Sequence, residues 1–115
     1  QPSFKRDYYE SSSPDLSMIQ LQLANKQRLY DLRLNSIKTK YNSILKIMDI
    51  SLYEYQDLQK YYIDELTKFA NMLNTGKYDL SINSVYDYIF GKLNSIENDL
   101  YSDVKSKRNN KTRKQ

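Results

Sequence analysis

The sequence predicts an all-α protein, a three-helix antiparallel bundle whose first helix is too long for the other two to cover. Apolar residues recur at helical spacing in three segments that turn signals separate. No segment shows the strict alternation of apolar and polar residues that is typical of a strand. Because the connections are short, neighbouring helices should run antiparallel. We expect helices at about residues 14–48, 52–74 and 82–104.

The first helix is marked by an apolar residue at every seventh position. A repeat of this kind keeps one face of a helix apolar over many turns. Ser13, Pro14 and Asp15 together predict the start of the helix. The hydroxyl can cap a free backbone amide, proline suits the first helical position, and the carboxylate suits the positive end of the helix dipole. The repeat consists of Leu16, Leu23, Tyr30, Ile37 and Ile44.

The second and third helices carry apolar stripes with steps of three and four residues. Ser51 and Glu54 have the spacing of a capping box, which predicts that the second helix starts at about residue 52. Gly76 predicts its end, because glycine adopts the left-handed conformation at a helix terminus without steric cost. The stripes are Leu52, Tyr55, Gln59, Tyr62, Leu66, Phe69 and Leu73, followed by Ile82, Val85, Ile89, Leu93, Ile96, Leu100 and Val104.

The lengths of the helices predict that part of the first one projects from the bundle. At 1.5 Å per residue the first helix spans about 50 Å and each of the others about 33 Å. The projecting part should be its amino-terminal half, which carries apolar residues outside the main stripe and should pack against another molecule. Two alternatives stay open: a break near Asn25, or a longer third helix. The additional apolar residues are Met18, Leu21, Leu29 and Leu32.

Residues 1–13 show neither the helical period nor alternation, and we expect an extended arm there. The arm contains three aromatic residues but has no apolar periodicity of its own. It can therefore bury these side chains only against something else. Phe4, Tyr8 and Tyr9 are the predicted partner anchors in the arm.

Charge is divided unevenly along the chain. Residues 14–48 hold six basic and two acidic residues, whereas residues 49–104 hold four basic and ten acidic residues. We favour the interpretation that this asymmetry aligns the helices by electrostatic complementarity. The alternative is a basic face for nucleic acid or an acidic partner on the first helix, at Lys26, Arg28, Arg33, Lys38 and Lys40.

The last eleven residues, 105–115, contain six basic side chains and no acidic one. We expect a basic disordered tail, because the segment has no apolar residue with which to pack. Such a tail can neutralise phosphates without reading a base sequence, and docking on an acidic protein remains open. The candidate phosphate contacts here are Lys105, Lys107, Arg108, Lys111, Arg113 and Lys114.

The inventory of reactive side chains argues against an enzyme. The chain has no histidine and no cysteine, which excludes Ser-His and Cys-His machinery, disulfides and thiolate metal sites. We therefore expect no catalytic residue, no metal, no cofactor and no small-molecule substrate. No apolar run approaches the 18 or more residues that a membrane span requires, so no membrane partner is expected.

Together these observations predict a non-catalytic structural subunit of a large macromolecular complex. A phage virion component is favoured, because the abundant Asn, Lys, Tyr and Ile residues are typical of an AT-rich genome. The predicted partners are proteins, a homo-oligomer included, and docking should use the arm and the projecting half of the first helix. The expected location is the virion or the host cytoplasm. Secretion stays open, because the chain begins with Gln1 rather than Met. The alternative is a nucleic-acid-associated protein that binds phosphates non-specifically through the basic helix face and the tail.

Overall fold

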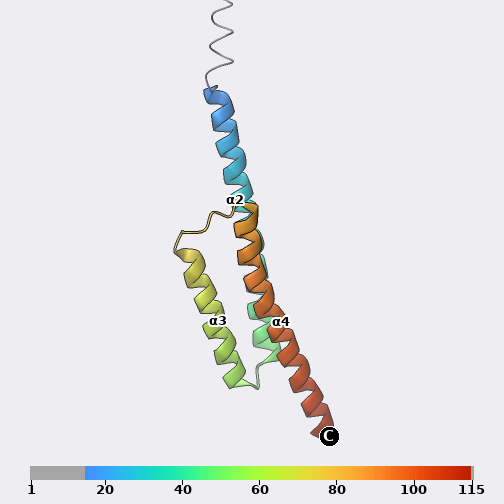
Figure 1. The fold of residues 1–115 in the computed structure, drawn as a ribbon. Helices are drawn as coiled ribbons and strands as arrows, with labels where there is room; N and C mark the ends of the chain where they lie inside the picture. Colours follow the sequence, from blue (N-terminus) through green and yellow to red (C-terminus); the bar gives the residue numbers. More distant parts are fainter. Residues whose placement is uncertain (1–14, 115) are drawn as a thin grey trace, which may run out of the picture.

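The computed structural model describes residues 15–114, with side chains up to residue 109, and contains three α-helices in this range (Figure 1). Helix α2 spans Leu16–Ser51, α3 spans Gln56–Asn74 and α4 spans Asn83–Lys114. Helix α3 runs back along the second half of α2, and α4 then runs in the direction of α2 (Figure 1). The described residues form no strand. The prediction of an all-α three-helix bundle with a long first helix is confirmed.

The three predicted stripes meet in one apolar core between the helices. The stripes of the second and third helices are buried or partly buried along most of their length. Ile82 is the exception, because it precedes α4 and is 47% exposed. The first stripe is buried only in the second half of α2. The core consists of Ile37, Ile44, Met48, Leu52, Tyr62, Leu66, Phe69, Leu80, Ile89, Leu93, Leu100 and Val104.

Helix α2 begins at Leu16, two residues later than predicted. Its N-cap is Asp15, whose Oδ1 accepts a hydrogen bond of 2.9 Å from the backbone amide of Ser17. A carboxylate at this position satisfies a free amide and also suits the positive end of the helix dipole. The predicted cap at Ser13 and Pro14 lies outside the described residues, as do the predicted arm and its anchors Phe4, Tyr8 and Tyr9.

The predicted capping box at Ser51 is wrong. Ser51 is the last residue of α2, and α3 begins at Gln56 after the N-cap Tyr55, which makes no side-chain capping hydrogen bond. The amide of Leu52 still donates to the Met48 carbonyl at 2.9 Å, so the chain stays helical up to this point. Leu52 is fully buried. Extending α2 places Leu52 in line with Met48, and the burial gained there outweighs a local cap on the surface.

The predicted end of the second helix is confirmed at Gly76. This glycine has a φ of 74°, in the left-handed region, and follows α3 by two residues. Just before it, the Thr75 hydroxyl donates to the Met72 carbonyl at 2.8 Å. The following connection is anchored by Leu80, which is fully buried. Helix α4 can therefore start close to α2, where the third helix was expected.

The predicted end of the third helix at residue 104 is wrong, and so is the disordered tail. Helix α4 continues to Lys114. The segment after Val104 contains neither glycine nor proline, and lysine and arginine are good helix formers. Their positive charge also suits the negative end of the helix dipole. The extension runs beyond the turn between α2 and α3, away from the amino-terminal half of α2 (Figure 1).

The amino-terminal half of α2 stands clear of the bundle (Figure 1). The helix is continuous through Asn25, so the predicted break is not found. Residues 16–29 are all exposed, and Tyr30 is the first partly buried residue of the helix. Helix α4 extends at its other end, so its greater length covers none of these residues. The prediction that the first half of this helix projects is confirmed for the described residues.

Candidate protein-docking surface

The projecting half of α2 carries two apolar stripes on different faces. The first, the bundle-line stripe, consists of Leu16, Ile19 and Leu23 and continues the face that enters the core at Ile37 and Ile44. The second, the side stripe, consists of Met18, Leu21, Leu29 and Leu32. At 3.6 residues per turn, the centres of the two stripes lie about 150° apart around the helix. A partner can therefore approach the helix from two sides.

Both stripes are exposed to an extent that is unusual for large apolar side chains. Their exposed fractions range from 36% at Ile19 to 73% at Leu16. Single exposed apolar residues are common on proteins, but a contiguous group of this kind marks an interaction surface. The predicted partner-binding residues Met18, Leu21, Leu29 and Leu32 are thus exposed as expected and lie on one face.

The basic side chains of α2 mostly contact the chain itself. Arg33 donates to the Leu80 carbonyl at 2.8 Å and to Asn83 Oδ1 at 2.6 Å, and its guanidinium lies 4.9 Å from the centre of the Tyr86 ring. Arginine suits this position, because its planar group can donate to several acceptors while it stacks on an aromatic ring. Arg33 therefore fixes the start of α4 against α2.

Two lysines of α2 form ion pairs with acidic residues of the connection and of α4. Lys26 Nζ lies 3.2 Å from Asp79 Oδ2, and Lys40 Nζ lies 2.8 Å from Glu97 Oε1. The Lys40–Glu97 pair is the better shielded of the two. These contacts favour the interpretation that charge asymmetry aligns the helices of one bundle. Of the residues predicted to contact phosphate on α2, Lys26 and Arg33 instead interact with residues of their own chain.

Asp79 organises the connection before α4. Its Oδ1 accepts hydrogen bonds from the Ser81 hydroxyl at 2.6 Å and from the Ser81 amide at 3.0 Å. These two bonds, the side-chain bond first, lower the pKa of Asp79, and Lys26 adds to the effect. The carboxylate therefore stays ionised and keeps its contact with α2. Arg28 and Lys38, the remaining residues of the predicted basic face, are exposed, and Arg28 donates to Asn25 Oδ1 at 3.4 Å.

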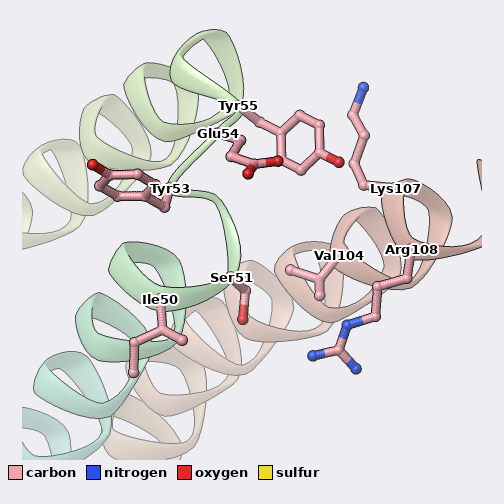
Figure 2. A pocket seen from close by; sticks show the side chains of 8 residues that line it. All are labelled: Ile50, Ser51, Tyr53, Glu54, Tyr55, Val104, Lys107 and Arg108. Carbon is pink, nitrogen blue, oxygen red and sulfur yellow. The ribbon is translucent and has the colours of Figure 1, made fainter. Parts of the chain in front are cut away.

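A pocket of about 380 Å³ lies at the opposite end of the bundle, between the turn after α2 and the extension of α4 (Figure 2). Lys107 Nζ lies 5.2 Å from the centre of the Tyr55 ring, and Arg108 lines the other side of the pocket (Figure 2). Ile50 and Tyr53 are 80% and 77% exposed at its rim. This pocket was not predicted from the sequence, because Lys107 and Arg108 were expected in a disordered tail.

Of the other basic residues predicted in the tail, Lys105 is exposed on α4. The side chains of Lys111, Arg113 and Lys114 lie outside the described part. Within the described residues, no group of three His, Cys, Asp or Glu side chains could hold a metal ion. None of the described helices is long and apolar enough to cross a membrane.

Comparison of the chain with known protein families, with curated proteins and with solved structures finds no match. Function therefore has to be inferred from the geometry of the described residues. Their most distinctive surface is the pair of apolar stripes on the projecting half of α2.

Proposed function

We propose that the protein is a non-catalytic assembly subunit that binds a protein partner through the projecting half of α2. The observation that carries the proposal is the exposure of both apolar stripes on a helix that no other part of the described residues 15–114 covers. The bundle of α3, α4 and the second half of α2 supplies the rigid base from which this helix extends. A virion as the surrounding assembly stays a prediction from composition.

The magnitude of the available burial supports docking through a long contact. Complete burial of one Leu, Ile or Met side chain contributes about 1.5–3 kcal/mol. The seven side chains of the two stripes are roughly half exposed, so covering all of them would contribute on the order of 5–10 kcal/mol. Association itself costs about 4–15 kcal/mol in lost freedom of motion. One or two contacts would not offset this cost, so a partner should follow the helix over several turns.

Photo-crosslinking in the cells that make the protein tests the proposal. A benzophenone amino acid at Leu23, on the bundle-line stripe, should give a discrete crosslinked protein species. The matched control is Ile63 on α3, an exposed apolar residue with 47% of its surface accessible that belongs to neither stripe. Absence of a crosslinked species at Leu23, or equal crosslinking at Ile63, would contradict the proposal.

Non-specific nucleic-acid binding is the second candidate function, and the extension of α4 favours it. The extension carries Lys105, Lys107 and Arg108 on a regular helix beyond the turn. If these residues bind phosphates, fluorescence anisotropy should show DNA or RNA binding whose affinity falls steeply between 50 and 200 mM salt, as roughly expected for several phosphate contacts. Deletion of residues 105–115 should remove the binding. No detectable binding at low salt would rule this candidate out.

A further inference from the structure

We infer that the side stripe is a self-association surface, on which a second copy of this chain packs antiparallel with a two-fold axis at Asn25. The inference rests on the proposed function and names one partner for one of the two stripes. The positions on this face of α2 are residues 18, 21, 25, 29 and 32. Their spacings of three, four, four and three residues read the same in both directions, with Asn25 at the centre.

This symmetry is what a two-fold dimer of helices requires. In an isologous contact, where one residue of the first copy meets a second residue of the other copy, the second residue of the first copy meets the first residue of the other. With Asn25 opposite Asn25, Met18 meets Leu32 of the second copy and Leu21 meets Leu29. All four apolar residues are exposed, between 37% and 59%. The pairing therefore buries every apolar residue of the side stripe against another apolar residue.

Asn25 gives the pairing its register. A side-chain amide both donates and accepts hydrogen bonds, so two copies of Asn25 can bond across the axis. A single polar residue in an apolar seam fixes the register and orientation of paired helices. A shift by one turn would place Asn25 opposite a leucine and leave its amide without a partner. The carbonyl oxygen of Asn25 accepts from Arg28 at 3.4 Å, which orients the side chain.

Charge selects the antiparallel orientation. In this orientation Arg28 lies at the level of Gln22 of the second copy, and Asp31 lies at the level of Ile19. No like charges share a level along the contact. A parallel pair would instead place Arg28 beside Arg28 and Asp31 beside Asp31. Like charges at the same level disfavour a pairing, so the antiparallel arrangement is preferred.

The bundle leaves space for the end of the second helix. Beyond Leu32 the same face of α2 continues with Ser36, Thr39 and Ser43, which are small and uncharged. Together with Tyr86 and Phe90 of α4 they line an open groove of about 610 Å³. In the antiparallel pair, residue 15 of the second copy reaches the level of residue 35, where this groove begins. The two bundles then lie at opposite ends of the paired helices.

The size of the contact predicts a dimer of moderate strength. The four apolar side chains of each copy expose together on the order of 800 Å² over the pair, below the roughly 1,200–2,000 Å² of a standard stable interface. Flanking residues add to this area. The free energy gained by burial must also offset the loss of translational and rotational freedom on association. We expect a dissociation constant in the micromolar range, and the experiment should be run at about 100 μM protein.

Single cysteines test the symmetry directly, because the chain has no cysteine of its own. In a glutathione redox buffer Asn25→Cys should form a disulfide-linked dimer, because the two-fold axis places this position next to itself. Leu21→Cys and Leu29→Cys should each crosslink poorly alone and efficiently when mixed. Asn42→Cys, on an exposed position of α2 outside the side stripe, is the control.

Two results would overturn the pairing. One is an Asn25→Cys variant that crosslinks no more than Asn42→Cys. The other is self-crosslinking of Leu21→Cys and of Leu29→Cys without mixed products, which would indicate a parallel pair. Sedimentation equilibrium supplies a measurement without disulfides: the wild-type mass should approach twice that of the chain, and the Leu21→Glu/Leu29→Glu variant should be a monomer of unchanged helicity. A monomeric wild type would also overturn the pairing.

The two proposals can fail separately. If the purified chain is monomeric but the benzophenone at Leu23 still crosslinks to another protein, the self-association is wrong and the docking function stands. If neither a dimer nor a crosslinked species at Leu23 is found, both are wrong.

Discussion

Replacing Tyr62 by alanine should cost about 3–5 kcal/mol of folding free energy, as is typical of truncating a large buried aromatic side chain. Tyr62 lies in the middle of α3 and is only 1% exposed. Its ring makes an edge contact with Tyr61, with 5.0 Å between the ring centres. Its hydroxyl donates to Asp103 Oδ2 on α4 at 2.5 Å. The alanine variant loses this packing and the bond between α3 and α4 together.

The expected loss approaches the whole stability of a small domain, which is about 5–15 kcal/mol. Urea denaturation followed by circular dichroism should therefore show a much lower midpoint, or a chain that is partly unfolded without urea. Tyr62→Phe is the matched control, because it keeps the ring and removes only the hydroxyl. It should cost about 1–2 kcal/mol, since Asp103 is half-buried and loses a donor. Equal midpoints for the two variants would contradict the packing role of the ring.

The pH dependence of stability gives a second readout for Tyr62. Burial, followed by the hydrogen bond to Asp103, raises the pKa of Tyr62 above its ordinary value of 10.0. A raised pKa in the folded state means that the contribution of this group is complete below pH 10 and is lost as the pH rises above that value. The wild type should therefore lose stability above pH 10. The Tyr62→Phe variant should lose it less steeply, because the unfolded wild-type chain releases a proton that its folded state retains.

The role of Tyr62 could be predicted from the sequence, whereas the start of its helix could not. The three-and-four spacing around Tyr62 continues over the whole second helix, so the periodic signal averages over many residues. The capping box at Ser51 is a signal of four residues only. It competed with the burial of Leu52, and this burial depends on the assembled core. A short local pattern cannot show such a tertiary contact in advance.

The charge pattern was predictable in sum but not in detail. The sequence indicated that a basic first helix should align with acidic neighbours. It could not show that Arg33 meets a backbone carbonyl and an asparagine, because these acceptors carry no charge and lie far along the chain. The tail was mispredicted for a related reason. Its lack of apolar residues indicates that it cannot pack, but a helix that is already nucleated in α4 can extend through Lys105 and Lys107 without packing.

Recognising the docking surface on the exposed half of α2 required both the sequence and the structure. The off-stripe apolar residues were visible in the sequence, and length predicted that this half would project. The symmetry about Asn25 acquires its meaning only because the helix continues through that residue and nothing in the described chain covers it. A break at Asn25 would have separated Leu21 from Leu29 and removed the surface.

A matched pair of isoleucines on α2 should separate folding from docking. Ile44 and Ile19 belong to the same face of the helix, but Ile44 is fully buried and Ile19 is 36% exposed. Ile44→Ala should cost about 2–5 kcal/mol, because it leaves a cavity in the core. Ile19→Ala should cost less than about 1 kcal/mol, since few contacts are lost and alanine has the higher helix propensity.

The same substitution should thus reduce stability at position 44 and docking at position 19. Thermal denaturation of the dilute monomer should show a large decrease in midpoint for Ile44→Ala and almost none for Ile19→Ala. Crosslinking from Leu23 should weaken for Ile19→Ala, because this residue lies on the same stripe one turn away. Equal losses of stability would mean that residues 16–30 are covered by their own chain in solution. The amino-terminal half of α2 would then be part of the core, and a docking role would have no surface on which to act.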